Sequence, residues 1–108
     1  MDQCIMGVYE TIIDRLENPS ENSYTKYLFD RGIDKILKKV GEETAEVVIA
    51  AKNGDNKDTA AEIADLTYHL LVLMAQQGIK PQEVADILDQ RHKKSGNLKQ
   101  FHKTDKNT

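Results

Sequence analysis

Two clusters of carboxylates lie on apolar, helix-forming stretches that contain no lysine or arginine. The stretches span residues 40–51 and 58–79. The carboxylates that form the two clusters are, in chain order, Glu42, Glu43, Glu46, Glu62 and Asp65. Each cluster needs positive charge from outside its own stretch, and a hard divalent cation that prefers oxygen ligands, Mg²⁺ or Mn²⁺, is the simplest source. A metal held by carboxylates on helices indicates chemistry on phosphate groups.

The spacing of these residues predicts that the two clusters meet. Residues three or four apart share one face of a helix, so each cluster projects from one side of its helix. The connection around Gly54 is short, and two helices joined this way pack antiparallel. Counted from Gly54, Glu46 and Glu62 are each eight residues away, and Glu43 and Asp65 are each eleven away. Four carboxylates can therefore converge between the two helices.

An ordinary explanation of part of this pattern is a set of surface ion pairs. Lys38 and Glu42, and likewise Lys39 and Glu43, have the four-residue spacing of helical salt bridges. Such pairing accounts for Glu42 and Glu43 only, because Glu46 has no lysine or arginine at its neighbouring helical positions. Asp65 likewise has no lysine or arginine at its neighbouring helical positions. His69 lies one turn away, where it either orients Asp65, contacts the substrate or packs in the core. The pattern therefore favours a metal site.

Helical periodicity dominates the rest of the chain. We expect helices over residues 5–16, 34–52 and 58–77 and from residue 81 onward, with a loop and a short helix over residues 21–32. Asp34 is the expected N-cap of the second long helix, and Ser23 or Thr25 that of the short one. Thr59 and Glu62 have the spacing of a capping box, which would give Glu62 a purely structural role.

These elements predict an all-α protein, a four- to five-helix bundle in one domain over residues 1–94. Residues 95–108 are polar and form a C-terminal tail with no expected structure. The helix that carries Glu62 is apolar almost all the way round from residue 60 to residue 75, and so few helices would leave much of it exposed. We therefore expect a homodimer or a higher homo-oligomer to complete the bundle.

Composition narrows the choice of partners and compartment. The 108 residues carry a net charge of −3, which gives no electrostatic attraction to nucleic acid or to an anionic membrane. No apolar run approaches the roughly 20 residues needed to cross a bilayer. The start lacks the basic flank and apolar run of a signal peptide, and Cys4 is the single cysteine. We expect a cytoplasmic protein without disulfides.

Three segments carry a resemblance to a known family. They are residues 23–32 (SYTKYLFDRG), 38–52 (KKVGEETAEVVIAAK) and 62–73 (EIADLTYHLLVL). Together they resemble the phosphoribosyl-ATP pyrophosphatase family, part of the superfamily of all-α nucleotide pyrophosphohydrolases. The likeness covers about residues 5–93. It implies hydrolysis of the α–β phosphoanhydride of phosphoribosyl-ATP to phosphoribosyl-AMP and pyrophosphate, the second step of histidine biosynthesis.

The resemblance also implies roles for individual residues. The positions that match the family's magnesium ligands are Glu43, Glu46, Glu62 and Asp65. Glu42 would bind a second ion or accept a proton from the attacking water, so the expected catalytic set is Glu42, Glu43 and Glu46. Apart from the resemblance, three lysines flank the acidic cluster, and each could either hold the triphosphate or belong to a solvated helix face: Lys38, Lys39 and Lys52. The segment Ser23, Tyr24 and Thr25 would supply hydroxyls or a ring to the ribose or base.

Two other functions compete with this interpretation. One is a house-cleaning pyrophosphohydrolase of the dCTP or dUTP type, which would share the metal site and differ around the base and second ribose. The other is a non-catalytic helical dimerisation module with an acidic surface. In that module, replacing Glu46 or Asp65 by its amide would be harmless, and Mg²⁺ would not change the melting temperature.

Overall fold

The computed structural model describes residues 2–18 and 23–95, and within these ranges all regular structure is helical. Five helices follow one another, and their bounds are α1 (Gln3–Glu17), α2 (Tyr24–Arg31), α3 (Ile33–Lys52), α4 (Asn56–Gln77) and α5 (Pro81–Ser95). The predicted all-α class is confirmed. The predicted tail lies outside the described residues except for Ser95, which ends α5, so the domain boundary stays a prediction.

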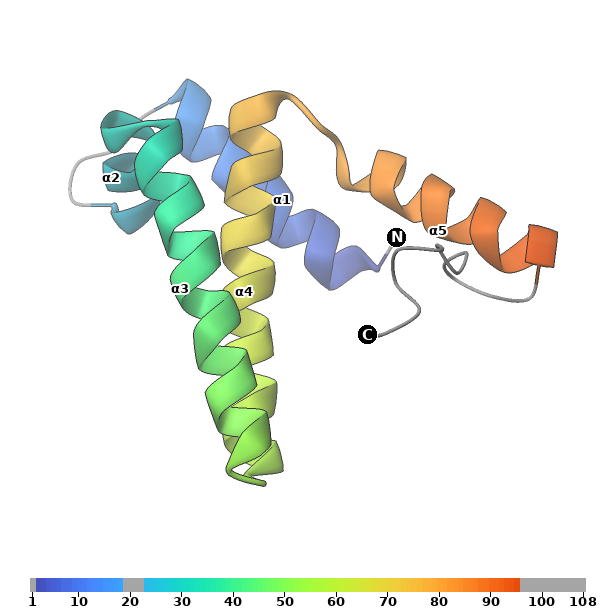
Figure 1. Ribbon diagram of the computed structural model, residues 1–108. Helices are drawn as coiled ribbons and strands as arrows, with labels where there is room; N and C mark the ends of the chain where they lie inside the picture. The colour runs from blue at the N-terminus through green and yellow to red at the C-terminus, as the bar shows by residue number, and fades with distance from the viewer. Residues whose placement is uncertain (1, 19–22, 96–108) are drawn as a thin grey trace.

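Helices α3 and α4 form a long antiparallel hairpin on which the other helices are arranged. Figure 1 shows the turn of this hairpin projecting beyond the other helices. Gly54 lies in that turn with φ +77°, a left-handed conformation that glycine adopts at little cost. Helix α1 packs on α4, α2 packs on α3, and α1 also contacts α2. These contacts lie toward the end of the hairpin opposite its turn (Figure 1).

The core lies where α1 and α2 cover this hairpin. Its buried residues come from four helices and are Tyr9, Ile12, Leu28, Ile36, Leu71, Val72 and Ala75. The Tyr9 hydroxyl donates a hydrogen bond of 2.9 Å to the carbonyl of Ile79, which fixes the connection between α4 and α5 against α1. Pro81 is fully buried at the first position of α5, where its missing N–H costs no helical hydrogen bond.

The helix starts differ in part from the predictions. The Ser23 side chain caps α2 by accepting from the backbone N–H of Lys26, as predicted. Helix α3, in contrast, begins directly after Gly32, so Asp34 lies inside the first turn and the prediction that it caps the helix was wrong. Helix α4 begins at Asn56 rather than near residue 58, because Asp55 caps it by accepting from the N–H of Asp58.

Because Asp55 caps α4, Glu62 does not belong to a capping box with Thr59. The Thr59 hydroxyl donates to the carbonyl of Asp55, so Thr59 is an interior residue of α4 and not its cap. The predicted capping box is therefore absent, and the Glu62 carboxylate has no part in starting the helix.

No helix of the described residues is long and apolar enough to span a membrane.

Candidate metal centre

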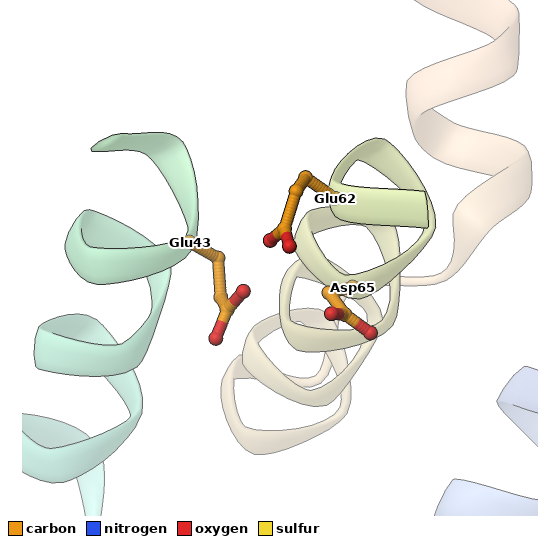
Figure 2. Close-up of side chains that lie close together, drawn as sticks. All are labelled: Glu43, Glu62 and Asp65. Atoms are coloured by element: carbon orange, nitrogen blue, oxygen red, sulfur yellow. The ribbon is translucent and has the colours of Figure 1, made fainter. Parts of the chain in front are cut away.

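Three carboxylates meet across the hairpin, as Figure 2 shows. Glu43 projects from α3 toward Glu62 and Asp65 on α4, and one oxygen from each side chain lies within 4.8 Å of the others. Glu43 and Glu62 are half-buried, whereas Asp65 is exposed. The α-helical period places Glu62 and Asp65 on one face of α4, and the antiparallel packing brings Glu43 opposite them.

The electrostatics of this cluster are unfavourable without a cation. Partial burial and the carboxylates of Asp58 and Asp65 raise the pKa of Glu62 above its ordinary value, and Glu46 and Glu43 add to the effect. No lysine of the described residues is within ion-pair distance of Glu62 or Asp65. Hard oxygen donors at this mutual spacing fit a small divalent cation, which would remove the repulsion.

Lys39 is the one lysine among the described residues that pairs with this cluster. Its ammonium lies 3.5 Å from a carboxylate oxygen of Glu42 and 3.5 Å from one of Glu43. Burial by itself lowers the pKa of Lys39, but Tyr24, Glu43 and Glu42 outweigh it and raise the pKa above the ordinary value. Lys39 therefore stays cationic. Glu42 pairs with Lys39 rather than with Lys38, so the surface ion-pair explanation holds in part for Glu42 and Glu43.

Two further acidic residues lie near the cluster without joining its three oxygens. Glu46, the fourth expected ligand, is exposed on α3, and its charge contributes to the raised pKa of Glu62. Asp58 precedes Glu62 by one turn of α4 and is the largest source of repulsion on it among the charged residues. Asp58 was not among the predicted site residues, although its four-residue spacing from Glu62 places the two side chains on one face of a helix.

The segment that begins α2 reaches the cluster through Tyr24. Its hydroxyl lies 2.8 Å from Nε2 of the buried His69, and Nδ1 of His69 lies 2.7 Å from the backbone carbonyl of Asp65. Burial raises the pKa of Tyr24, Lys39 opposes this, and Glu43 reinforces it. The phenol therefore stays protonated at neutral pH. This link was not predicted, because it joins residues far apart in the chain.

The other expected substrate-binding residues lie in varied surroundings. The Ser23 hydroxyl is engaged in capping α2, and buried Thr25 hydrogen-bonds the Tyr68 hydroxyl. Lys38 is exposed about one turn before the acidic residues of α3, and Lys52 is exposed in the last turn of the same helix.

A cavity of about 540 Å³ opens elsewhere, beside α1. Its lining includes Arg15, Ser23, Thr25 and Tyr68 and contains none of the three clustered carboxylates. Ser23 and Thr25 thus face a space that the carboxylate cluster does not line.

Comparison with known proteins assigns the chain to a family. Residues 6–92 match the family described as Phosphoribosyl-ATP pyrophosphohydrolase. The chain is 54% identical over 95 residues to the Phosphoribosyl-ATP pyrophosphatase of Clostridium novyi. This aligned region covers 88% of this chain and 86% of that relative. The chain is 49% identical over 104 residues to the protein of the same name from Lacticaseibacillus casei, covering 96% of this chain and 94% of the relative.

A longer relative matches through part of its length. The chain is 57% identical over 91 residues to the Histidine biosynthesis bifunctional protein HisIE of Lactococcus lactis, and it covers 43% of that protein. The match extends over 84% of this chain, so it includes both helices that carry the carboxylate cluster. The chain therefore belongs to the phosphoribosyl-ATP pyrophosphohydrolase family.

Proposed function

We propose that this protein hydrolyses phosphoribosyl-ATP to phosphoribosyl-AMP and pyrophosphate, the second step of histidine biosynthesis. Water adds to the α-phosphorus, the bond to the bridging oxygen breaks, and pyrophosphate leaves. The observation that carries the proposal is the meeting of Glu43, Glu62 and Asp65 across the hairpin, in a chain of this family.

The metal ligands are Glu43, Glu62 and Asp65, with Glu46 as the fourth. Glu46 is exposed one helical turn from Glu43, and its charge contributes to the raised pKa of Glu62. The oxygen donors suit Mg²⁺ first and Mn²⁺ also. When bound, such an ion neutralises charge that develops on phosphate oxygens and lowers the pKa of a water molecule.

The proton from the attacking water passes to a carboxylate of α3. Glu42 is the best placed, because it is exposed, lies one residue from Glu43 and is held near the cluster by Lys39. Lys39 then offers its ammonium to the triphosphate, with Lys38 and Lys52 as further cations on the same helix. As compact point charges these lysines position the phosphates and do not activate them.

Hydroxyls and a ring from Ser23, Tyr24 and Thr25 complete the substrate site. Tyr24 is the most exposed of the three and lies beside Lys39 and Glu43. The Thr25 hydroxyl is already engaged with Tyr68, so its contribution is to hold the start of α2 in place.

A second copy of the chain is the proposed partner of the hairpin. Apolar side chains remain exposed on both of its helices, with Val48 at 62% and Ile63 at 48%. Helices α1 and α2 contact the hairpin toward its opposite end (Figure 1). A homodimer through this face buries these side chains symmetrically, since a two-fold axis presents the same patch from both copies. A reducing cytoplasm is the expected compartment.

The substrate assignment is tested by assaying the purified protein on phosphoribosyl-ATP, ATP, dCTP and dUTP, with and without a chelator. We expect release of pyrophosphate from phosphoribosyl-ATP at the highest kcat/KM, and none in the presence of the chelator. Preference for a simple triphosphate would overturn the assignment in favour of a house-cleaning enzyme. Activity that survives complete metal removal would exclude the proposed role of the carboxylates.

A further inference from the structure

Two exposed tyrosine rings of α2 form an aromatic surface beside the carboxylate cluster. Tyr24 is 47% exposed and Tyr27 is 40% exposed, and their ring centroids lie 6.2 Å apart with the planes inclined by 28°. Adjacent exposed rings of this kind offer a planar base a place to stack. We call Tyr24 and Tyr27 the tyrosine surface.

The position of this surface is fixed by a hydrogen bond to the hairpin. The Asp65 carbonyl only accepts, so Nδ1 of His69 donates to it, and Nε2 of the same ring hydrogen-bonds the Tyr24 hydroxyl at 2.8 Å. His69 is 6% exposed and therefore has little freedom to move. Tyr24 is thus linked through the His69 ring to the backbone of Asp65, and its own side chain stays exposed.

Two cations flank the tyrosine surface at Tyr27. The Arg31 guanidinium carbon lies 5.8 Å from the Tyr27 ring centroid, and the Lys35 ammonium lies 6.0 Å from it. Neither forms an ion pair with a carboxylate of the described residues. Asp30 is engaged by Lys26 at 2.6 Å, and Asp34 is exposed in the first turn of α3.

The helical spacing on α3 orders these groups along one line. Lys35, Lys39 and Glu43 are four residues apart in succession, so they share one face and rise about 6 Å per step. Lys35 therefore lies about 12 Å along the helix axis from Glu43. Tyr24, which is near enough to Lys39 to raise its pKa, and Tyr27, whose ring lies under the Lys35 ammonium, run beside this line on α2. The order is carboxylates, Lys39, tyrosine surface and finally the cation pair.

We propose that Arg31 and Lys35 form a subsite for a phosphomonoester at the far end of the substrate, while the tyrosine surface holds the purine base. The inference rests on the proposed function. Phosphoribosyl-ATP differs from ordinary triphosphates by a second ribose that carries such a phosphate. We place the triphosphate at the carboxylates and the rest of the substrate along the face of α3 that carries Lys39 and Lys35. The phosphate of the second ribose then lies near Arg31 and Lys35, which lack a carboxylate partner among the described residues. Arginine and lysine are the side chains that bind phosphate most strongly, and both keep their charge at neutral pH.

The test compares ligands that differ only by the phosphoribosyl group. Inhibition by phosphoribosyl-AMP and by AMP is measured on the wild type, Arg31→Gln, Lys35→Gln and the double variant, together with KM for phosphoribosyl-ATP. Each single variant is expected to raise the inhibition constant of phosphoribosyl-AMP about tenfold, because it loses a charge-assisted contact. The double variant is expected to raise it about 100-fold. The inhibition constant of AMP is expected to change by about twofold or less, the range of surface substitutions. Lys94→Gln, an exposed lysine in the last turn of α5, is the control.

The outcomes separate this subsite from the proposed function. A wild type that does not hydrolyse phosphoribosyl-ATP refutes the proposed function itself. A wild type that hydrolyses it, with a double variant that still prefers phosphoribosyl-AMP over AMP by the wild-type ratio, refutes the subsite alone. Equal weakening of both ligands also refutes it, because the cations would then act on the shared nucleotide. Arg31→Lys, which keeps the charge, is expected to restore part of the lost affinity.

Discussion

Replacing Asp65 by asparagine is expected to remove most of the stabilisation that Mg²⁺ gives to the folded chain. Asp65 supplies one of three oxygens within 4.8 Å of one another, and no lysine of the described residues compensates its charge. An ion that binds only the folded state at ten times its dissociation constant stabilises it by about 1.4 kcal/mol. In a domain of this size that free energy corresponds to a rise in melting temperature of roughly 6–11 °C.

The loss of one ligand changes this figure in a predictable way. If the dissociation constant rises at least tenfold, the same Mg²⁺ concentration stabilises Asp65→Asn by about 0.4 kcal/mol or less, or roughly 2–3 °C. Thermal unfolding followed by circular dichroism, in a chelator and then over a series of Mg²⁺ concentrations at constant ionic strength, measures both shifts. Asp86→Asn is the matched control, because Asp86 is exposed on α5 and interacts with Gln82.

Two results would refute this reasoning. An equal Mg²⁺-induced shift in Asp65→Asn and the wild type would remove Asp65 from the ligand set. The absence of a shift in either protein would favour the non-catalytic dimerisation module, for which the acidic residues are only a solvated surface. A full shift in Asp86→Asn with a small one in Asp65→Asn is the pattern that the geometry predicts.

Three further expectations concern stability, assembly and substrate binding. Glu62→Gln should raise the melting temperature measured in chelator. The pKa of Glu62 is raised in the folded state, so the metal-free wild type should gain stability as pH falls from 7 toward that pKa. The variant should gain less stability over the same pH range, as measured by pH-dependent unfolding. Ile63→Asp, or Val48→Asp, should convert the proposed dimer to monomer in sedimentation velocity, and an unchanged species would exclude the hairpin face as the interface. Tyr24→Phe, which removes the hydroxyl bonded to His69, should raise KM for phosphoribosyl-ATP about two- to tenfold while the Mg²⁺-induced shift persists; an unchanged KM would count against the tyrosine surface.

The acidic cluster was predictable because it depends on few degrees of freedom. A helical period and a short connection determine which residues of two neighbouring helices lie opposite each other. The structure accordingly brings Glu43 opposite Asp65 and Glu62. Glu46 departs from the expected group of four for a physical reason. It is exposed, so its side chain can turn to solvent and relieve repulsion at little cost, and no periodicity argument includes that freedom.

Helix starts were less predictable than helix faces, because several polar residues compete for each cap. Asp34 and Asp55 both carry the carboxylate that a cap needs. Asp55 caps α4, whereas α3 starts after Gly32, whose φ of +87° turns the chain from α2 directly into the next helix. Asp34 is left inside the first turn, where its charge still interacts favourably with the helix dipole. The choice between such residues depends on how the chain enters the helix.

The tyrosine surface depends on packing that no local pattern specifies. Tyr24 and His69 are 45 positions apart, and they meet because α2 packs on α3 and α3 packs against α4. The sequence placed Tyr24 in a polar segment and His69 on an apolar helix, and neither position indicates the other. Once α2 is docked, however, the four-residue spacing of Lys35, Lys39 and Glu43 becomes informative, because Tyr24 and Tyr27 lie beside it. In the sequence alone this spacing looks like an ordinary charged helix face. Only the packing of α2 shows that it leads from the carboxylates, past the tyrosine surface, to the cations.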